Sequence, residues 1–133
     1  MQLEISTPER LLVREDVTEV QVPGANGYLG ILPQHAPLLS ELGCGEMWYV
    51  TEAGAKRVLS ICNGYLEVQP DHVRILADRA ESVDEIDVAR AQSALNRANE
   101  RLLNPLPGVD IARALAALAR AQARLAAAKS GGR

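Results

Sequence analysis

Residues 82–108, SVDEIDVARAQSALNRANERLLNPLPG, decide the fold, because the hydrophobic period of the chain changes within this stretch. Ser82 and Glu85 have the spacing of a helix capping box. Asp84 and Asp87 add negative charge where a helix N-terminus favours it. The apolar residues that follow have the three-four spacing of one helix seam: Val88, Ala91, Leu95, Ala98 and Leu102. The stretch therefore predicts a helix that begins close to Ser82.

A second helix is predicted after a short break. Residues 104–108, NPLPG, interrupt the first helix because proline lacks a backbone donor and restricts the residue before it. Asp110 is placed to cap the next helix, and residues 130–132, SGG, are placed to end it. The seam of this helix is predicted at Ile111, Leu115, Leu118, Gln122 and Leu125. A loop this short predicts that the two helices fold back as an antiparallel hairpin.

The chain before this stretch has the pattern of short β-strands. Apolar and polar residues alternate around residues 18–22, 66–68 and 73–75. Turn signals recur between them, among them Asn26-Gly27 and Asn63-Gly64. Such a pattern predicts a small antiparallel sandwich or barrel. We therefore expect an α+β protein with a β-sandwich in residues 1–83 and a helical hairpin in residues 84–133.

Composition excludes several classes of protein. The 133-residue chain is 47% apolar, which is enough to form a hydrophobic core. It has no run of roughly eighteen apolar residues of the kind that spans a membrane. Residues 1–5, MQLEI, lack the basic start and apolar run of a signal peptide. We therefore expect the protein to be made and kept in the cytoplasm.

Cysteine and histidine give no recognisable catalytic or metal site. Cys44 and Cys62 form no metal-ligand pattern with His35 or His72, so no metal is expected. We expect both cysteines to be reduced and buried in the sheet. His35 lacks a nucleophile or a carboxylate pair, so no catalytic residue is predicted. A small enzyme on a sandwich scaffold therefore has almost no support.

The charge of −3 is distributed unevenly. Residues 1–83 carry 6 basic and 12 acidic side chains, whereas residues 84–133 carry 8 basic and 5 acidic ones. Two parts of opposite charge suggest two different partners. Nucleic acid is not expected, because the basic part has no aromatic residue on which bases can stack.

The composition of the hairpin leaves two interpretations open. It has 14 alanines in 50 residues, which favours helix but gives narrow apolar seams. A buried leucine contributes about 1.5–3 kcal/mol, whereas alanine offers one methyl group. Such helices form readily and dock weakly, as a movable element requires. A plain helical cap that never leaves the sandwich fits the same composition equally well.

Three motifs carry a resemblance to a known family. Residues 27–39, GYLGILPQHAPLL, look like the signature loop of the epsilon subunits of F-type ATP synthase. Residues 63–68, NGYLEV, and residues 73–78, VRILAD, resemble two later strands of that family. The resemblance covers essentially the whole chain in order. It implies a sandwich of about ten antiparallel strands and a C-terminal hairpin of two helices.

The resemblance also implies a function without catalysis by the chain itself. Members of the family are rotor subunits of the proton-translocating enzyme, in which the sandwich binds the gamma subunit and the ring of c subunits. Their hairpin extends toward the alpha and beta subunits to inhibit ATP hydrolysis. The implied location is the cytoplasmic face of the energy-transducing membrane, with membrane contact only through the complex. Many relatives have an acidic residue where Tyr28 stands, so the polar contact with the ring is expected to differ.

A further likeness concerns ATP. Residues 86–91, IDVARA, match the I-D-x-x-R-A motif of epsilon subunits that bind ATP on the hairpin. The resemblance assigns the adenine and ribose to Glu81, Ile86, Asp87, Arg90 and Ala91, and the phosphates to Arg97, Arg120 and Arg124. There is no phosphate-binding loop of the G-x-x-x-x-G-K-[ST] type, so ATP is expected as a regulatory ligand and not as a substrate.

Residue chemistry agrees with this assignment but leaves alternatives. Helical spacing places one row of arginines on each helix, and folding the hairpin is expected to bring the rows together. A triphosphate would relieve their repulsion, and the planar guanidinium suits phosphate oxygens. The arginines also fit a solvated face, or a surface that meets the beta subunit. A structural stalk adaptor that senses no nucleotide therefore remains the alternative function.

Overall fold

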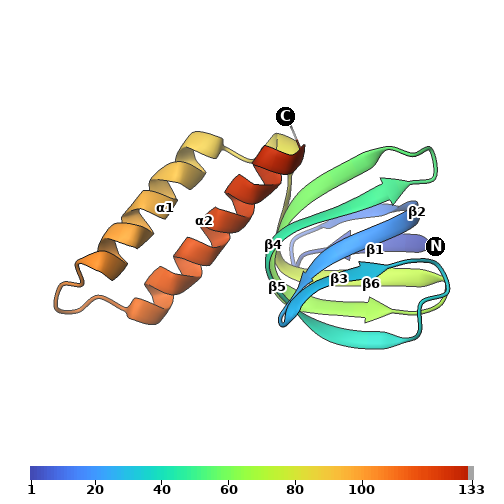
Figure 1. Ribbon diagram of the computed structural model, residues 1–133, viewed down its shortest axis with the longest axis horizontal. Helices are drawn as coiled ribbons and strands as arrows, with labels where there is room; N and C mark the ends of the chain where they lie inside the picture. Colours follow the sequence, from blue (N-terminus) through green and yellow to red (C-terminus); the bar gives the residue numbers. More distant parts are fainter. Residues whose placement is uncertain (132–133) are drawn as a thin grey trace.

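A computed structural model, which describes residues 1–131, has a β-sandwich followed by a helical hairpin (Figure 1). The strands are β1 (Gln2–Ser6), β2 (Leu11–Gly24), β3 (Gly27–Ile31), β4 (Leu38–Thr51), β5 (Lys56–Val68) and β6 (His72–Ser82). One 3-10 turn, η1 (Val83–Glu85), leads to the helices α1 (Val88–Leu103) and α2 (Ile111–Gly131). The expected sandwich and hairpin are confirmed.

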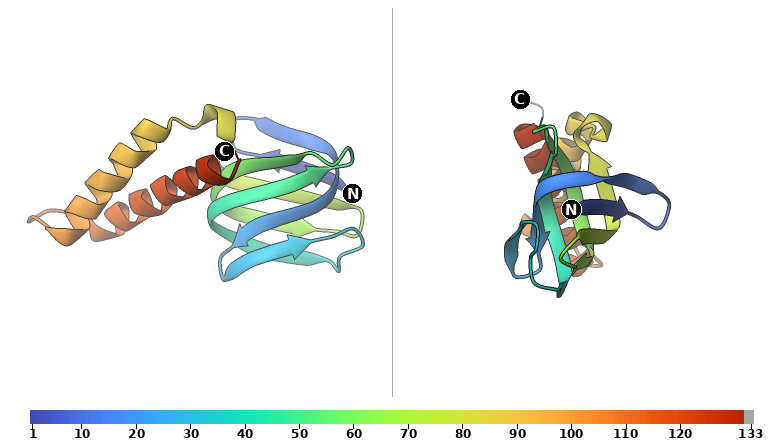
Figure 2. Two further views of the ribbon diagram at one scale, coloured as in Figure 1. Left: turned by 45° about the horizontal axis from the view of Figure 1, so that its top comes forward. Right: turned by 90° about the vertical axis from the view of Figure 1, so that its right-hand side faces the viewer.

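The six strands form one sheet that closes on itself. Their order is β1-β6-β5-β4-β2-β3, and β1 also pairs with β2, which joins the two sides of the sheet (Figure 2). Every pairing is antiparallel except that of β1 with β6, which is parallel. The closed sheet leaves few unpaired strand edges, as in a small barrel.

The strand count differs from the ten strands that the resemblance implied, because several strands are long and bend around the sandwich. β2 and β4 each have 14 residues and β5 has 13. In β5 the bend falls at Asn63 and Gly64, whose φ angles are 60° and 119°. A side chain at position 64 would clash with the carbonyl oxygen of Leu76, so this bend requires glycine. The predicted turn at Asn63-Gly64 is therefore a bend inside one strand.

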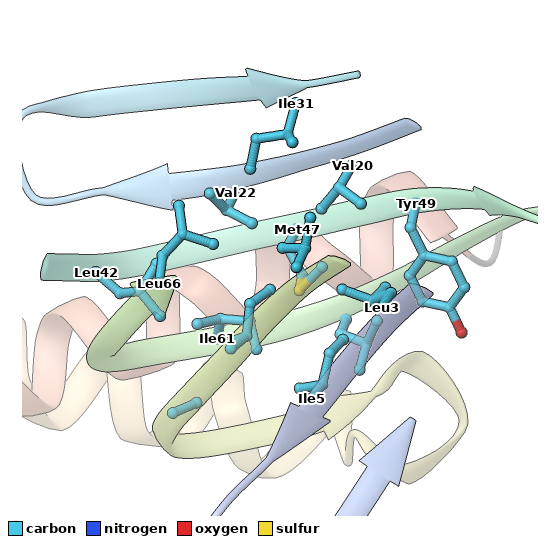
Figure 3. Packing of buried hydrophobic residues seen from close by; sticks show 14 of the residues in the cluster. Leu3, Ile5, Val20, Val22, Ile31, Leu42, Met47, Tyr49, Ile61 and Leu66 are labelled. Atoms are coloured by element: carbon cyan, nitrogen blue, oxygen red, sulfur yellow. The ribbon is translucent and has the colours of Figure 1, made fainter. Parts of the chain in front are cut away.

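The larger of the two hydrophobic clusters lies within the sandwich (Figure 3). Its fully buried members include Leu3, Ile5, Val20, Val22, Ile31, Met47, Ile61, Leu66 and Ile75. Among residues 1–131, neither helix contributes a side chain to this cluster. Each such side chain contributes about 1.5–3 kcal/mol on burial, so the sandwich does not need the hairpin for its core.

The first helix begins later than predicted. The capping box of Ser82 and Glu85 forms, but it starts only the single turn η1. Ile86 is then extended because its side chain is buried between the sandwich and the end of α2. α1 begins after Asp87, whose carboxylate accepts a hydrogen bond from the backbone N–H of Arg90 at 3.0 Å. The cap of α1 is therefore Asp87 and not Ser82.

The predicted end of α1 and start of α2 agree with the structure, but the predicted seam of α2 is wrong at three of its five residues, while Leu118 and Leu125 are half-buried. Asp110 accepts a hydrogen bond from the backbone N–H of Arg113 at 3.0 Å. Ile111, Leu115 and Gln122 of the predicted seam are exposed. The buried residues of α2 are alanines: Ala114, Ala121, Ala123, Ala127 and Ala128. α2 packs on both α1 and the sheet, and small side chains permit this close approach. Gly132, predicted to help end the helix, lies outside the described residues.

The two cysteines form a disulfide, so the expectation of reduced thiols is wrong for this structure. The pairing of β4 with β5 places Cys44 directly opposite Cys62, with Cα atoms 3.9 Å apart. The eighteen-residue separation gave no sign of this pairing, because the register depends on the whole hairpin between the two strands.

Candidate functional site at the junction of sandwich and hairpin

The hairpin joins the sandwich mainly through α2. This helix packs on β4 and β5, whereas α1 packs on α2 (Figures 1 and 2). The loop between the helices lies at the end of the hairpin that is farthest from the sandwich. The position of the whole hairpin therefore depends on the side chains between α2 and the sheet.

This contact is poor in large apolar side chains. The buried residues of α2 are all alanine, and each provides one methyl group. The pairing of β4 with β5 places Glu46 opposite Ser60, on the face turned away from the core because the neighbouring Ile61 points inward. The Oε2 atom of Glu46 is buried and has no hydrogen-bond partner among residues 1–131. Burial of an unpaired polar atom costs free energy, so we expect α2 to dock weakly.

A small apolar cluster holds the C-terminal end of α2. Ile86 is buried against Ala127 and Ala128, and Val58 of β5 packs beside them. Gly131 packs closely against Val58, because a side chain at position 131 would clash with it. The cluster fixes the last turn of α2, while the rest of the helix has only smaller contacts.

One ion pair connects α2 to the last strand. Nε of Arg124 donates a hydrogen bond to Oε1 of Glu81 at 2.5 Å. Their side chains are 34% and 28% exposed, so water screens the pair only in part. We expect a contribution of about 1 kcal/mol, near the upper end for surface pairs.

A cleft of about 540 Å³ lies beside this ion pair, and we name it the α2–β6 cleft. Its charged lining residues are Glu9, Arg10, Asp78, Arg79, Glu81, Arg120 and Arg124. Thr7, Cys62 and Asn63 also line it. Four guanidinium groups face three carboxylates here, so the cleft has a net positive charge if all of them are ionised.

Arg120 carries the largest electrostatic cost in this cleft. Burial lowers the pKa of its guanidinium below the ordinary value. The positive charges of Arg79, Arg124 and Arg113 lower that pKa further. Arginine nevertheless stays protonated at physiological pH, so the repulsion persists in the folded chain. An anion placed among these groups would relieve it.

Three predicted ligand residues lie together in the α2–β6 cleft: Glu81, Arg120 and Arg124. Arg97 does not line it. That arginine borders a hollow near the hairpin loop, beside Leu106. The expected two arginine rows approach each other near the loop, where Arg101 and Arg113 border one hollow.

The other predicted residues lie where the first helix begins. Ile86 and Ala91 are buried, so neither side chain offers a free apolar surface to an adenine ring. Asp87 is occupied by its capping hydrogen bond, and Arg90 is exposed. The phosphate end of a nucleotide therefore fits the described residues better than the adenine end does.

Arg79 and Arg10 belong to the cleft but were absent from the predicted set. Pairing of β5 with β6 places Arg79 opposite Cys62, and both residues line the cleft beside α2. Arg10 follows β1 and donates a hydrogen bond to Glu85 at 2.6 Å. Strand register could have indicated the position of Arg79, but the register is set by contacts between distant parts of the chain.

The connection between β3 and β4, residues 32–37 of the signature loop, lies at the end of the sandwich remote from the hairpin (Figures 1 and 2). The backbone N–H of Gln34 donates to the carbonyl of Pro70 at 3.0 Å, which ties this loop to the turn between β5 and β6. His35 has its ring nitrogen Nδ1 2.7 Å from the carbonyl oxygen of Ala36, so it takes part in the turn. Leu32 and Leu39 are 58% and 73% exposed. Exposed leucines at one end indicate a surface for a protein partner.

No helix within residues 1–131 is long and apolar enough to cross a membrane. The same residues contain no group of three or more histidine, cysteine, aspartate or glutamate side chains that could hold a metal ion.

Known protein families match this chain along nearly its whole length. The family described as "ATP synthase, Delta/Epsilon chain, beta-sandwich domain" matches residues 1–83. The family described as "ATP synthase, Delta/Epsilon chain, long alpha-helix domain" matches residues 84–129. The "ATP synthase epsilon chain" of Solibacter usitatus is 59% identical over 82% of this chain and 81% of its own length. That of Moorella thermoacetica is 48% identical over the same shares.

Two solved structures have a similar fold. A chain in the cryo-EM structure of the Euglena gracilis mitochondrial ATP synthase, OSCP/F1/c-ring, superposes with a TM-score of 0.77 at 25% identity, over 87% of this chain and 73% of that one. A chain in the Tetrahymena thermophila mitochondrial ATP synthase central stalk/c-ring structure gives 0.60 at 12% identity, over 97% and 94%, which supports the fold alone. The domain matches and the close relatives together show that this chain belongs to the delta/epsilon chain family of ATP synthase subunits.

Proposed function

We propose that the chain, which is not itself catalytic, is a rotor subunit in the central stalk of a proton-translocating F-type ATP synthase. Family membership and the similarity to a chain of the Euglena gracilis complex, which contains F1 and a c-ring, support this role. The subunit is then peripheral, on the cytoplasmic face of the energy-transducing membrane, and it transmits rotation between the ring and the catalytic head.

The sandwich is the proposed coupling element. Its core is complete without the hairpin, which suits a rigid part that carries torque. The exposed leucines of the signature loop supply an apolar surface for the ring of c subunits at the end remote from the hairpin. The gamma subunit is the other expected partner of the sandwich. Purification of the complex from membranes should recover this chain with gamma and c subunits, and their consistent absence would contradict the proposal.

The hairpin is the proposed regulatory element, and the observation that carries this proposal is the composition of the α2 contact. Alanines, one small apolar cluster and one ion pair hold α2 on the sheet, beside a buried carboxylate oxygen without a partner. A contact of this kind permits the helices to leave the sandwich while the sandwich stays folded. The released hairpin would extend toward the alpha and beta subunits and inhibit ATP hydrolysis.

ATP is the proposed ligand of the docked hairpin. The guanidinium groups of Arg120 and Arg124 suit phosphate oxygens, and Arg90 is free to reach a ligand at the start of α1. Ligand at 100 times its dissociation constant favours the docked state by about 2.7 kcal/mol if the extended state binds none. Such a gain shifts a nearly balanced pair of states almost completely.

Calorimetric titration of ATP into the purified chain tests the sensing role. We expect binding that the substitution Arg90→Ala weakens and that Arg14→Ala, a control on β2, leaves unchanged. Absence of binding at millimolar ATP would remove the sensing role. Absence of any effect of Arg90→Ala would remove the proposed contact.

Removal of residues 84–133 tests inhibition. We expect the reassembled complex to hydrolyse ATP faster with the truncated chain than with the full chain, while both support coupled proton pumping. Equal rates of hydrolysis would contradict inhibition by the hairpin.

A structural adaptor without nucleotide sensing is the second candidate, and one observation favours it. The ion pair between Arg124 and Glu81 already joins two residues that the ATP assignment requires. Such a pair holds α2 on the sandwich without a ligand. The same titration separates the candidates, because the adaptor binds no ATP and keeps full coupling.

A further inference from the structure

The α2–β6 cleft brings together cations from two parts of the chain. Arg79 belongs to β6 of the sandwich, whereas Arg120 belongs to α2 of the hairpin, and both line the cleft. The positive charge of Arg79 acts on the guanidinium of Arg120 more strongly than the charges of Arg124 and Arg113 do. This repulsion crosses the junction, so it opposes docking of α2 on the sandwich.

The carboxylates nearby leave these two cations unpaired. Glu81 pairs with Arg124, and Glu85 pairs with Arg10. Glu9 and Asp78 line the cleft, but neither has a basic nitrogen within 4.0 Å among residues 1–131. The remaining guanidinium groups, of Arg79 and Arg120, also lack a carboxylate within that distance in the same part of the chain.

A ligand that suits this cleft is therefore an anion with several oxygens. Two guanidinium groups, one from β6 and one from α2, can each give parallel N–H donors to a phosphate group. The amide of Asn63, also on the lining, is a further possible donor. The volume of about 540 Å³ falls in the ordinary range for small-molecule sites.

We propose that the α2–β6 cleft binds a polyphosphate oxyanion between Arg79 of the sandwich and Arg120 of α2, and that the anion fastens the hairpin to the sandwich. The ligand chemistry is the linear phosphate chain, either free or as the phosphate tail of a nucleotide. The nucleotide form rests on the proposed function, whereas the free form does not. Arg79 thereby becomes a ligand-binding residue that lies outside the hairpin.

Titration of the full chain with tripolyphosphate and, separately, with ATP tests the site. We expect tripolyphosphate to bind and the substitution Arg79→Ala to weaken it by about tenfold, since a charge-assisted contact is lost. Arg74→Ala is the matched control, because Arg74 lies on the same strand and borders a different hollow. Affinity should fall as salt is raised for the wild-type chain and for the control variant.

Reversal of the charge at position 79 provides a second test, which measures docking of α2 and not the loss of anion binding. In the wild-type chain, tripolyphosphate should slow hydrogen exchange of the α2 amides. Arg79→Glu replaces repulsion across the junction by attraction to Arg120. This variant should therefore show slow hydrogen exchange of the α2 amides without any anion. Addition of tripolyphosphate should not slow that exchange further.

The possible results separate this site from the proposed nucleotide sensing. Tripolyphosphate that fails to bind, or that binds equally well to Arg79→Ala, overturns the site. ATP binding that depends on Arg90 but not on Arg79 overturns the nucleotide form of the site, while nucleotide sensing stands and tripolyphosphate binding alone decides the free form. Tripolyphosphate binding that depends on Arg79, together with no binding of ATP at millimolar concentration, supports the site and contradicts nucleotide sensing.

Discussion

Arg124 on α2 and Glu81 at the end of β6 form an ion pair across 43 positions of sequence, with Nε and Oε1 2.5 Å apart. It is a direct polar bond between hairpin and sandwich. We predict that Glu81→Gln makes docking of α2 on the sandwich less favourable by about 1 kcal/mol, after allowance for the exposed fraction of the pair. Hydrogen exchange of the α2 amides should become faster, while exchange within the strands stays unchanged.

Glu67→Gln is the control for this prediction. Glu67 lies 3.7 Å from Arg74, but that pair joins neighbouring strands and does not involve the hairpin. The substitution Glu67→Gln should therefore leave hydrogen exchange of the α2 amides unchanged. If Glu81→Gln gave the same exchange in α2 as the wild-type chain, the ion pair would have no role in holding the hairpin.

The buried carboxylate under α2 gives a second prediction. Oε2 of Glu46 is buried without a hydrogen-bond partner among the described residues. Methionine has a similar length and no polar oxygen, so we predict that Glu46→Met raises the free energy of unfolding by about 1 kcal/mol. Urea unfolding measures the change. Glu52→Met, in the exposed turn between β4 and β5, should give no gain. A loss of stability in Glu46→Met would show that the carboxylate is stabilised in the docked state.

The disulfide between Cys44 and Cys62 gives a third prediction. It links neighbouring strands beside the α2–β6 cleft and closes a loop of eighteen residues. Loop-closure entropy predicts that its reduction lowers the free energy of unfolding by about 3 kcal/mol. Thermal unfolding with and without a dithiol reductant measures this change, and the Cys44→Ala/Cys62→Ala double variant should be insensitive to reductant. A wild-type chain equally insensitive to reductant would contradict the disulfide.

Local sequence patterns predicted the sandwich and the hairpin because they depend on short-range chemistry. The change of period after residue 81, the proline break at residues 104–108 and the cap at Asp110 all act within a few residues. The same patterns misplaced the start of the first helix. The capping box at Ser82 is satisfied, but burial of Ile86 prevents the turn from continuing. A tertiary contact thus overrode a local signal.

The site was harder to predict for a related reason. Glu81, Arg120 and Arg124 were identified by resemblance, and the cleft brings them together. Arg79 was missed because its place beside them depends on the register of β6 against β5. The buried face of α2 was wrongly assigned to leucines, since hydrophobicity alone cannot show that two partners approach one helix closely enough to require alanine.

The junction should also respond to acid, which is the fourth prediction. The hydrogen bond from Arg10 holds the pKa of Glu85 below its ordinary value of 4.5, and the backbone N–H of Ser82 lowers it further. A carboxyl group with a lowered pKa in the folded state stabilises the fold above its unfolded pKa, and this stabilisation is lost as the pH falls. The carboxyl side chain is 39% exposed, so we expect less than about 1 kcal/mol.

The substitution Glu85→Gln isolates this effect, because glutamine can still accept the hydrogen bond from Ser82 at the cap. The wild-type chain should be more stable than the variant at about pH 7, and the difference should shrink as the pH falls below 4.5 and be lost once the pH passes below the lowered pKa of Glu85. Urea unfolding of both chains across this range measures the difference. A difference that stayed constant with pH would mean that the amide disturbs the cap and that the charge of Glu85 contributes nothing.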